Sequence, residues 1–141
     1  MFDSFYAIIL LLKQQEREMF DVVFYENASG ESELLSFLEE LRVKARRSKD
    51  ARIQYKQLTF YIELLQRSGN ELPTDVAKHL KDGIWELRPG CNRVFYFFFS
   101  ENTFVLLHHY RKRTQKTPPR ELEKALAEKA DFLARKEKVK Q

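Results

Sequence analysis

Runs of hydrophobic residues divide the chain into segments with the length of strands. Residues 19–25 (MFDVVFY) are rich in β-branched and aromatic side chains and end at the turn formers of residues 27–30, so they predict a first strand. Three similar runs, residues 84–88, 93–100 and 103–112, follow one another with only short breaks between them. They predict three strands of an antiparallel meander.

Apolar residues spaced three and four apart predict two amphipathic helices between the first strand and the meander. Ser29 or Ser32 is placed to cap the first helix, whose apolar face carries Leu34, Leu35, Leu38 and Leu41. The second helix begins near Asp50 and closes at Gly69, with its apolar stripe at Ala51, Tyr55, Leu58, Ile62 and Leu65. The two helices form a helical hairpin, and we expect its apolar stripes to pack against the sheet formed by the meander.

A third amphipathic segment follows the meander. Thr117 is placed as its N-cap, and Pro118 and Pro119 fall in the first turn, where a missing N–H group costs nothing. Its apolar stripe runs to Leu133, and residues 134–138 predict a frayed, charged end. The element order is therefore β-α-α-β-β-β-α, an α+β fold with a two-helix hairpin packed on a small antiparallel sheet and a C-terminal helix.

Residues 1–18 stand apart from this pattern. The apolar run of residues 5–12 is too short for a helix that spans a membrane, which needs about twenty residues. Asp3 sits where a signal peptide would be positive, and charged residues follow where a cleavage site would be. The segment is either a short extra helix or an extension ahead of the true start at Met19. We favour the extension, with residues 19–141 as the single domain.

Composition sets the class of protein. The chain has 141 residues, of which 43% are hydrophobic and 13% aromatic, enough for one globular domain with its own core. Cys91 is the only cysteine, so no internal disulfide can form, and the Cys and His residues lack zinc-ligand spacing. These features are typical of a reduced, cytoplasmic protein without a structural metal.

Charge is concentrated in the meander and its edges. Residues 78–118 contain three acids and eight cations, which are Lys78, Lys81, Arg88, Arg93, Arg111, Lys112, Arg113 and Lys116. That is an excess of five positive charges in a chain whose net charge is +4, so the remainder is slightly acidic. The distribution favours one local site for a polyanion over a generally basic surface.

The same stretch offers the groups that RNA cleavage requires. Attack by the 2′-hydroxyl needs a base, cations on the developing phosphorane charge and an acid for the leaving oxygen. Glu86 or His108 is the candidate base, and Tyr110 or a histidine the candidate acid. The candidate phosphate clamp consists of Arg88, Arg93, Lys112 and Arg113, which should then lie together on one exposed concavity.

Structural roles compete with these assignments. Strand alternation places Glu86 and Arg88 on one face, where they can form an ordinary ion pair. Regular alternation also predicts that Leu106, His108, Tyr110 and Lys112 share a face in the last strand, opposite Leu107, His109, Arg111 and Arg113. The histidines can be plain strand-end residues, and the basic segment after them a solvated loop.

Two segments of the meander resemble a known family. They are GIWELRP (83–89), followed closely by RVFY (93–96), and HHYRKRTQKTPPRELEKAL (108–126). Together they resemble the phage-derived HigB-like branch of the RelE/ParE toxin superfamily, over about residues 19–133. The family pattern carries its glutamate onto Glu86, its arginines onto Arg88 and Arg93, and its paired lysines onto Lys112 and Arg113, with Lys116 before Thr-Pro.

The resemblance implies the small RelE-like fold and a toxin of a toxin–antitoxin pair. Many members cleave mRNA in the ribosomal A site without a metal, so it implies a ribosome-dependent endoribonuclease that needs no cofactor. Tyr110 stands where the family usually has Phe, and members do not share one catalytic set. A ParE-like gyrase inhibitor and a non-catalytic binding module on the same fold therefore stay open as alternatives.

The resemblance also implies a partner. In HigB-like systems the antitoxin typically carries a helix-turn-helix and is encoded immediately downstream. Its acidic face would either cover Arg88, Arg93, Lys112 and Arg113 or dock on the two helices near the basic residues 42–47. We expect the ribosome and mRNA as the other partners, and no membrane.

Overall fold

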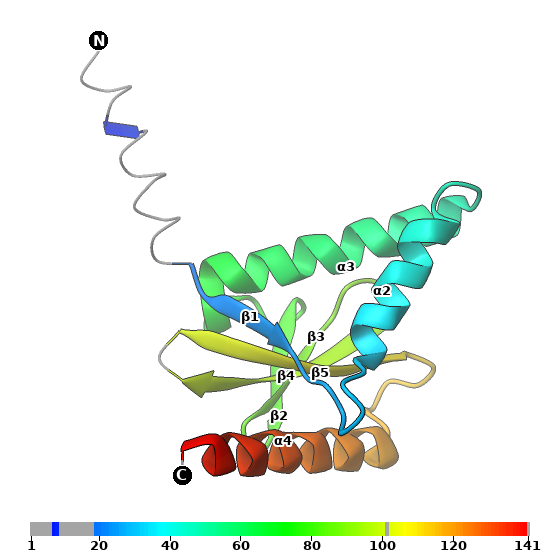
Figure 1. Ribbon diagram of the computed structural model, residues 1–141. Helices are drawn as coiled ribbons and strands as arrows, with labels where there is room; N and C mark the ends of the chain where they lie inside the picture. Colours follow the sequence, from blue (N-terminus) through cyan, green and yellow to red (C-terminus); the bar gives the residue numbers. More distant parts are fainter. Residues whose placement is uncertain (1–6, 9–18, 101, 141) are drawn as a thin grey trace.

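The sheet lies between two helical layers. The computed structural model describes residues 7–8, 19–100 and 102–140. Helices α2 (Glu33–Lys44) and α3 (Lys49–Ser68) form a hairpin over one face of the sheet, and α4 (Pro119–Lys140) covers the other (Figure 1). The predicted α+β fold and its helical hairpin are confirmed. The proposed extension of residues 1–18 lies outside the described residues, residues 7–8 excepted, and stays a prediction.

Five strands form the sheet in the order β1-β5-β4-β3-β2. They are β1 (Asp21–Phe24), β2 (Ala77–Lys81), β3 (Ile84–Leu87), β4 (Asn92–Ser100) and β5 (Thr103–Arg111). The meander is antiparallel as predicted, but β1 pairs with β5 in parallel, at the edge of the sheet opposite β2. The sequence pattern missed β2, a short edge strand with exposed lysines that lacks a β-rich composition.

Serine side chains set the start of both hairpin helices. Ser32 Oγ accepts a hydrogen bond from the Leu35 N–H group, and Ser48 Oγ accepts one from Ala51, each at 3.1 Å. The short 3₁₀ turn η1 (Gly69–Glu71) follows α3.

Thr117 does not cap α4 as predicted, since its hydroxyl donates to Glu86 instead. Helix α4 extends to Lys140, beyond Leu133, the last residue of the predicted apolar stripe.

Each face of the sheet has its own hydrophobic core. On the hairpin side, Leu58 and Leu65 of α3 pack against Tyr96 and Leu106. On the α4 side, Phe95, Phe97 and Leu107 pack against Ala125. Burial of each large side chain contributes roughly 1.5–3 kcal/mol, so both helical layers are held on the sheet mainly by apolar contact.

A β-bulge in β5 changes which side chains face α4. Val94 pairs with His109 and Tyr96 with Leu106, so Phe95 alone lies opposite both Leu107 and His108. Regular alternation placed Leu106 with His108 and Tyr110, and that prediction is wrong. Leu106 belongs to the hairpin-side core, whereas Leu107, His108 and Tyr110 all face α4.

Candidate functional site

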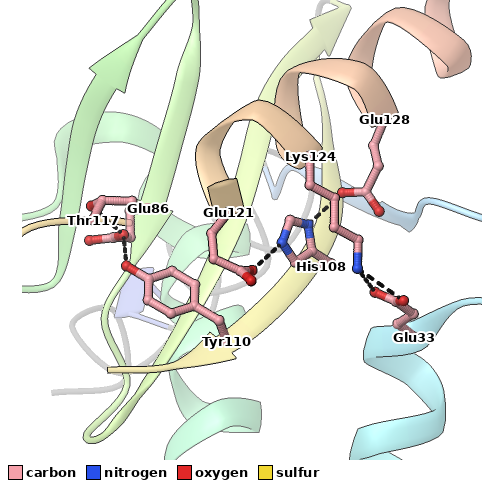
Figure 2. Close-up of polar contacts among 8 residues, drawn as sticks. All are labelled: Glu33, Glu86, His108, Tyr110, Thr117, Glu121, Lys124 and Glu128. Carbon is pink, nitrogen blue, oxygen red and sulfur yellow. Dashed lines mark hydrogen bonds and ion pairs between the residues drawn. The ribbon is translucent and has the colours of Figure 1, made fainter. Parts of the chain in front are cut away.

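A buried carboxylate organises the α4 face where β3, β4 and β5 carry polar residues. Strand β3 directs Glu86 to this face, and the residue is only 1% exposed. Its Oε2 atom accepts hydrogen bonds from the Tyr110 hydroxyl at 2.6 Å and from the Thr117 hydroxyl at 2.9 Å (Figure 2). Strand β3, the end of β5 and the segment before α4 therefore meet at one oxygen.

Two arginines approach the other oxygen of Glu86. Arg88 Nε lies 3.3 Å from Oε1 and Arg93 Nε lies 3.9 Å from it. Arg93 is 8% exposed, and its Nη1 group donates to the carbonyl oxygens of Gly90 at 2.7 Å and Asn92 at 2.8 Å. The Arg88 side chain is 26% exposed and opens towards solvent. We call these five residues, Glu86, Arg88, Arg93, Tyr110 and Thr117, the Glu86 cluster.

The electrostatics of the cluster fix the protonation of its tyrosine. A buried carboxylate is costly unless it is paired and hydrogen-bonded, and the two arginines and two hydroxyls meet that need for Glu86. Burial, assisted by the hydrogen bond to Glu86, raises the pKa of Tyr110 to about 12. Tyr110 therefore stays protonated at neutral pH and can donate a proton or a hydrogen bond.

His108 lies outside this cluster and serves to fasten α4. It is fully buried, with Nδ1 at 2.5 Å from Glu128 Oε1 and Nε2 at 2.9 Å from Glu121 Oε2 (Figure 2). Lys124 of the same helix reaches Glu33 of α2 at 2.7 Å. Both ring nitrogens are occupied by carboxylates, so the structure places His108 away from solvent and gives it no free atom for a substrate.

The remaining predicted cations are exposed and lie at different edges. Lys112, Arg113 and Lys116 follow β5, and the Lys112 N–H group donates to the Cys91 carbonyl oxygen, next to the start of β4. Lys78 is exposed on edge strand β2, where it pairs in register with Glu86, and Lys81 pairs with Ile84. Arg93 is buried, so the four clamp arginines and lysines do not form the fully exposed set that the sequence predicted.

Two features of the site were missed from sequence. Thr117 was interpreted as a helix cap because Thr before Pro-Pro is a common helix start, and nothing local shows that it reaches Glu86. Arg111 was grouped with the cations of one local polyanion site, which we expected to bind RNA, but it pairs with Asn92 at the end of the sheet and lines a pocket on the hairpin side.

Among the described residues, none of the helices combines the length and the hydropathy that a membrane span requires.

Comparisons with known proteins place the chain among phage-derived sequences. The family described as "Phage derived protein Gp49-like (DUF891)" matches residues 36–130. Among solved structures, the chain is similar to a chain of the toxin–antitoxin complex RelBE2 from Mycobacterium tuberculosis, with 22% identity and a TM-score of 0.41. That match covers 67% of this chain and 99% of the other. No curated protein sequence matches.

Proposed function

This chain belongs to the phage-derived Gp49-like family, and from that premise we propose that it is the toxin of a toxin–antitoxin module and cuts mRNA on the ribosome. The family match confirms the resemblance to phage-derived toxins seen in the sequence motifs. The observation that supports cleavage is the Glu86 cluster, in which a carboxylate, two guanidinium groups and a protonated phenol converge beside exposed cations.

Each member of the cluster has a proposed part. Arg88, the more exposed arginine, contacts the scissile phosphate, while Arg93 holds positive charge below it and stabilises the phosphorane. When the phosphate draws Arg88 away, Glu86 Oε1 is freed to take the proton of the 2′-hydroxyl. Tyr110 then donates its proton to the leaving 5′-oxygen, so that a cyclic phosphate and a 5′-hydroxyl result.

The loop after β5 and the edge of β2 extend the proposed RNA contact. Lys112, Arg113 and Lys116 on one side and Lys78 and Lys81 on the other are exposed and add positive charge around the Glu86 cluster. Contacts of this kind hold the phosphate backbone without reading its sequence.

A second candidate function is a non-catalytic binding module on the same fold. It is favoured by one observation, that Glu86 has partners on both oxygens and His108 is buried between two carboxylates. Neither group is a free base in the absence of substrate.

Expression of the chain without a partner separates these functions. The proposal predicts growth arrest with mRNAs cut within codons, and loss of both effects in Arg88→Ala. Arrest with intact mRNA and damaged DNA would instead identify a gyrase inhibitor. A chain that expresses freely and leaves mRNA intact would identify the binding module.

We further propose that an antitoxin with a helix-turn-helix binds this chain. An acidic face of that partner would cover the exposed cations around the Glu86 cluster or dock on the basic turn between α2 and α3. Co-purification with the product of the neighbouring reading frame tests this. Failure to recover any complex from co-expressed proteins would refute the partner.

A further inference from the structure

A second polar site lies on the face of the sheet opposite the Glu86 cluster. It is a pocket of about 360 Å³ between the α2–α3 turn and the ends of β4 and β5. Its polar lining consists of Lys44, Ser48, Asp50, Gln54, Asn92, His109 and Arg111, and apolar residues complete it. The volume falls within the range of natural ligand sites, near its lower end.

Two buried amides give the pocket a fixed hydrogen-bonding wall. Asn92 is 2% exposed and Gln54 is 8% exposed. Asn92 Nδ2 donates to Gln54 Oε1 at 3.0 Å, and Gln54 Nε2 donates to Asp50 Oδ2 at 2.7 Å. Among the described residues, these bonds leave Asn92 Oδ1 and one N–H group of each amide for an occupant. The wall therefore presents donors and acceptors in set positions.

The mouth of the pocket is positively charged. Arg111 is exposed, and no carboxylate in the described part of the chain pairs with it, while Lys44 bonds Glu40 at 2.7 Å. The turn between α2 and α3 adds Arg46 and Arg47, and α3 begins with Lys49. These three cations likewise make no ion pair with a described residue. Lys44 is paired with Glu40 and Asp50 adds one negative charge, but the arginines and Lys49 have no carboxylate partner among the described residues, so the mouth keeps a positive excess that attracts an anionic ligand.

We propose that this pocket binds one unpaired nucleotide of RNA, with its phosphate on Arg111 and Lys44 and the edge of its base on Asp50, Gln54 and Asn92. An acidic peptide side chain would satisfy the cations, but it would place a carboxylate near Asp50. A base offers Asp50 an exocyclic amino group and offers the two amides a matching edge. Uracil lacks that amino group, so it is the poorest fit.

The pocket and the Glu86 cluster use neighbouring residues of the same two strands. Asn92 and Arg111 pair across β4 and β5, and the next pair is Arg93 with Tyr110, whose side chains face α4. An RNA strand that passes around this end of the sheet would present adjacent nucleotides to the two faces. The inference thus rests on the proposed function for the identity of the ligand, and it adds a subsite that reads a base near the cut.

Titration of the purified protein followed by amide NMR tests the pocket directly. The probes are AMP, GMP, CMP, UMP, inorganic phosphate and glutamate. We expect the shifts to centre on Gln54, Asn92 and Arg111. We also expect UMP to bind about fivefold more weakly than at least one other nucleotide, and phosphate and glutamate more weakly than all four. Binding of phosphate as tight as that of nucleotides, or of glutamate as tight, would overturn the proposal, as would saturation that moves no pocket residue.

Two exposed substitutions separate phosphate contact from base recognition. Arg111→Ala should weaken all four nucleotides about tenfold, whereas Asp50→Asn should mainly reduce the difference between UMP and the others. Arg67→Ala, an exposed arginine near the other end of α3, is the matched control and should leave binding unchanged. Equal affinities in wild type and both pocket variants would refute the site. Because this binding needs no cleavage, an inactive wild type that still binds nucleotides would contradict the proposed function alone.

Discussion

Glu86 is the residue whose partners assemble the candidate site, and its removal should be costly. Glu86→Ala leaves the buried Arg93 without its carboxylate and the two hydroxyls without their acceptor. We expect the free energy of unfolding to fall by about 3 kcal/mol, as measured by urea denaturation. Glu123→Ala, on the exposed side of α4, should change it by less than about 0.5 kcal/mol. Equal effects of the two substitutions would show that the cluster does not stabilise the fold.

Alternation in β3 was enough to predict that Glu86 and Arg88 share a face, because side chains of a regular strand point alternately to the two faces of the sheet. It was not enough to predict the partners of Glu86. Thr117 and Tyr110 reach it from segments 24 and more residues away, and such contacts depend on how the whole chain folds. Burial of Arg93 was missed for the same reason, since the residue type alone favours an exposed position.

His109 should make stability depend on pH. Burial, with smaller effects from the neighbouring charges of His108 and Lys124, lowers the pKa of His109, whose ring stacks on Phe37 with centroids 3.9 Å apart. A lowered pKa means that the neutral ring stabilises the folded state above about pH 6.5 and that this contribution is lost as pH falls below it. His109→Phe keeps the stack without a titrating group.

We therefore expect the melting temperature of the wild type to fall more between pH 7.5 and pH 5.5 than that of His109→Phe. Thermal unfolding of both proteins in the same buffers provides the measurement. Parallel curves across this range would exclude His109 as the titrating group.

At the scale of elements, α4 is held by a histidine between two glutamates as well as by apolar contacts. His108→Ala removes the imidazole ring that lies between Glu121 and Glu128, so both carboxylates lose their contact with a ring nitrogen. We expect faster amide hydrogen exchange in α4 with little change in α3, and a loss of stability of roughly 2–4 kcal/mol. His79→Ala, on exposed β2, is the control. Unchanged protection of α4 in His108→Ala would show that apolar packing alone holds the helix.

The helices of the hairpin could be predicted from the sequence because their apolar spacing repeats over several turns. The bulge in β5 could not be predicted, because it is defined by the register against β4 and not by any residue type. The bulge moves Leu106 to the hairpin side, but His108 still shares the α4 face with Tyr110, and it is the carboxylates of Glu121 and Glu128 that occupy its ring nitrogens. Strand β2 was missed because its pairing with β3, and not its composition, makes it a strand.

At the scale of the molecule, the sheet separates two polar sites at the ends of the same strands. The Glu86 cluster lies on the α4 face and the pocket of Asn92 and Arg111 on the hairpin face. Among the cations of residues 78–118, Arg111 lines the pocket on the hairpin face, whereas Arg88, Arg93 and Lys78 lie with Glu86 on the α4 face. A toxin of this design would contact RNA around the end of the sheet, with the rest of the surface near neutrality.

Cleavage of a defined mRNA in a translation system reconstituted from purified ribosomes tests the central claim most directly. With the wild-type chain, mapping of 5′ ends should reveal cuts within codons that appear only when ribosomes are present. Glu86→Gln and Arg88→Ala should each lower the rate by about a hundredfold, and Arg67→Ala should retain it. Intact mRNA with the wild type, or equal cleavage by all four proteins, would contradict the account.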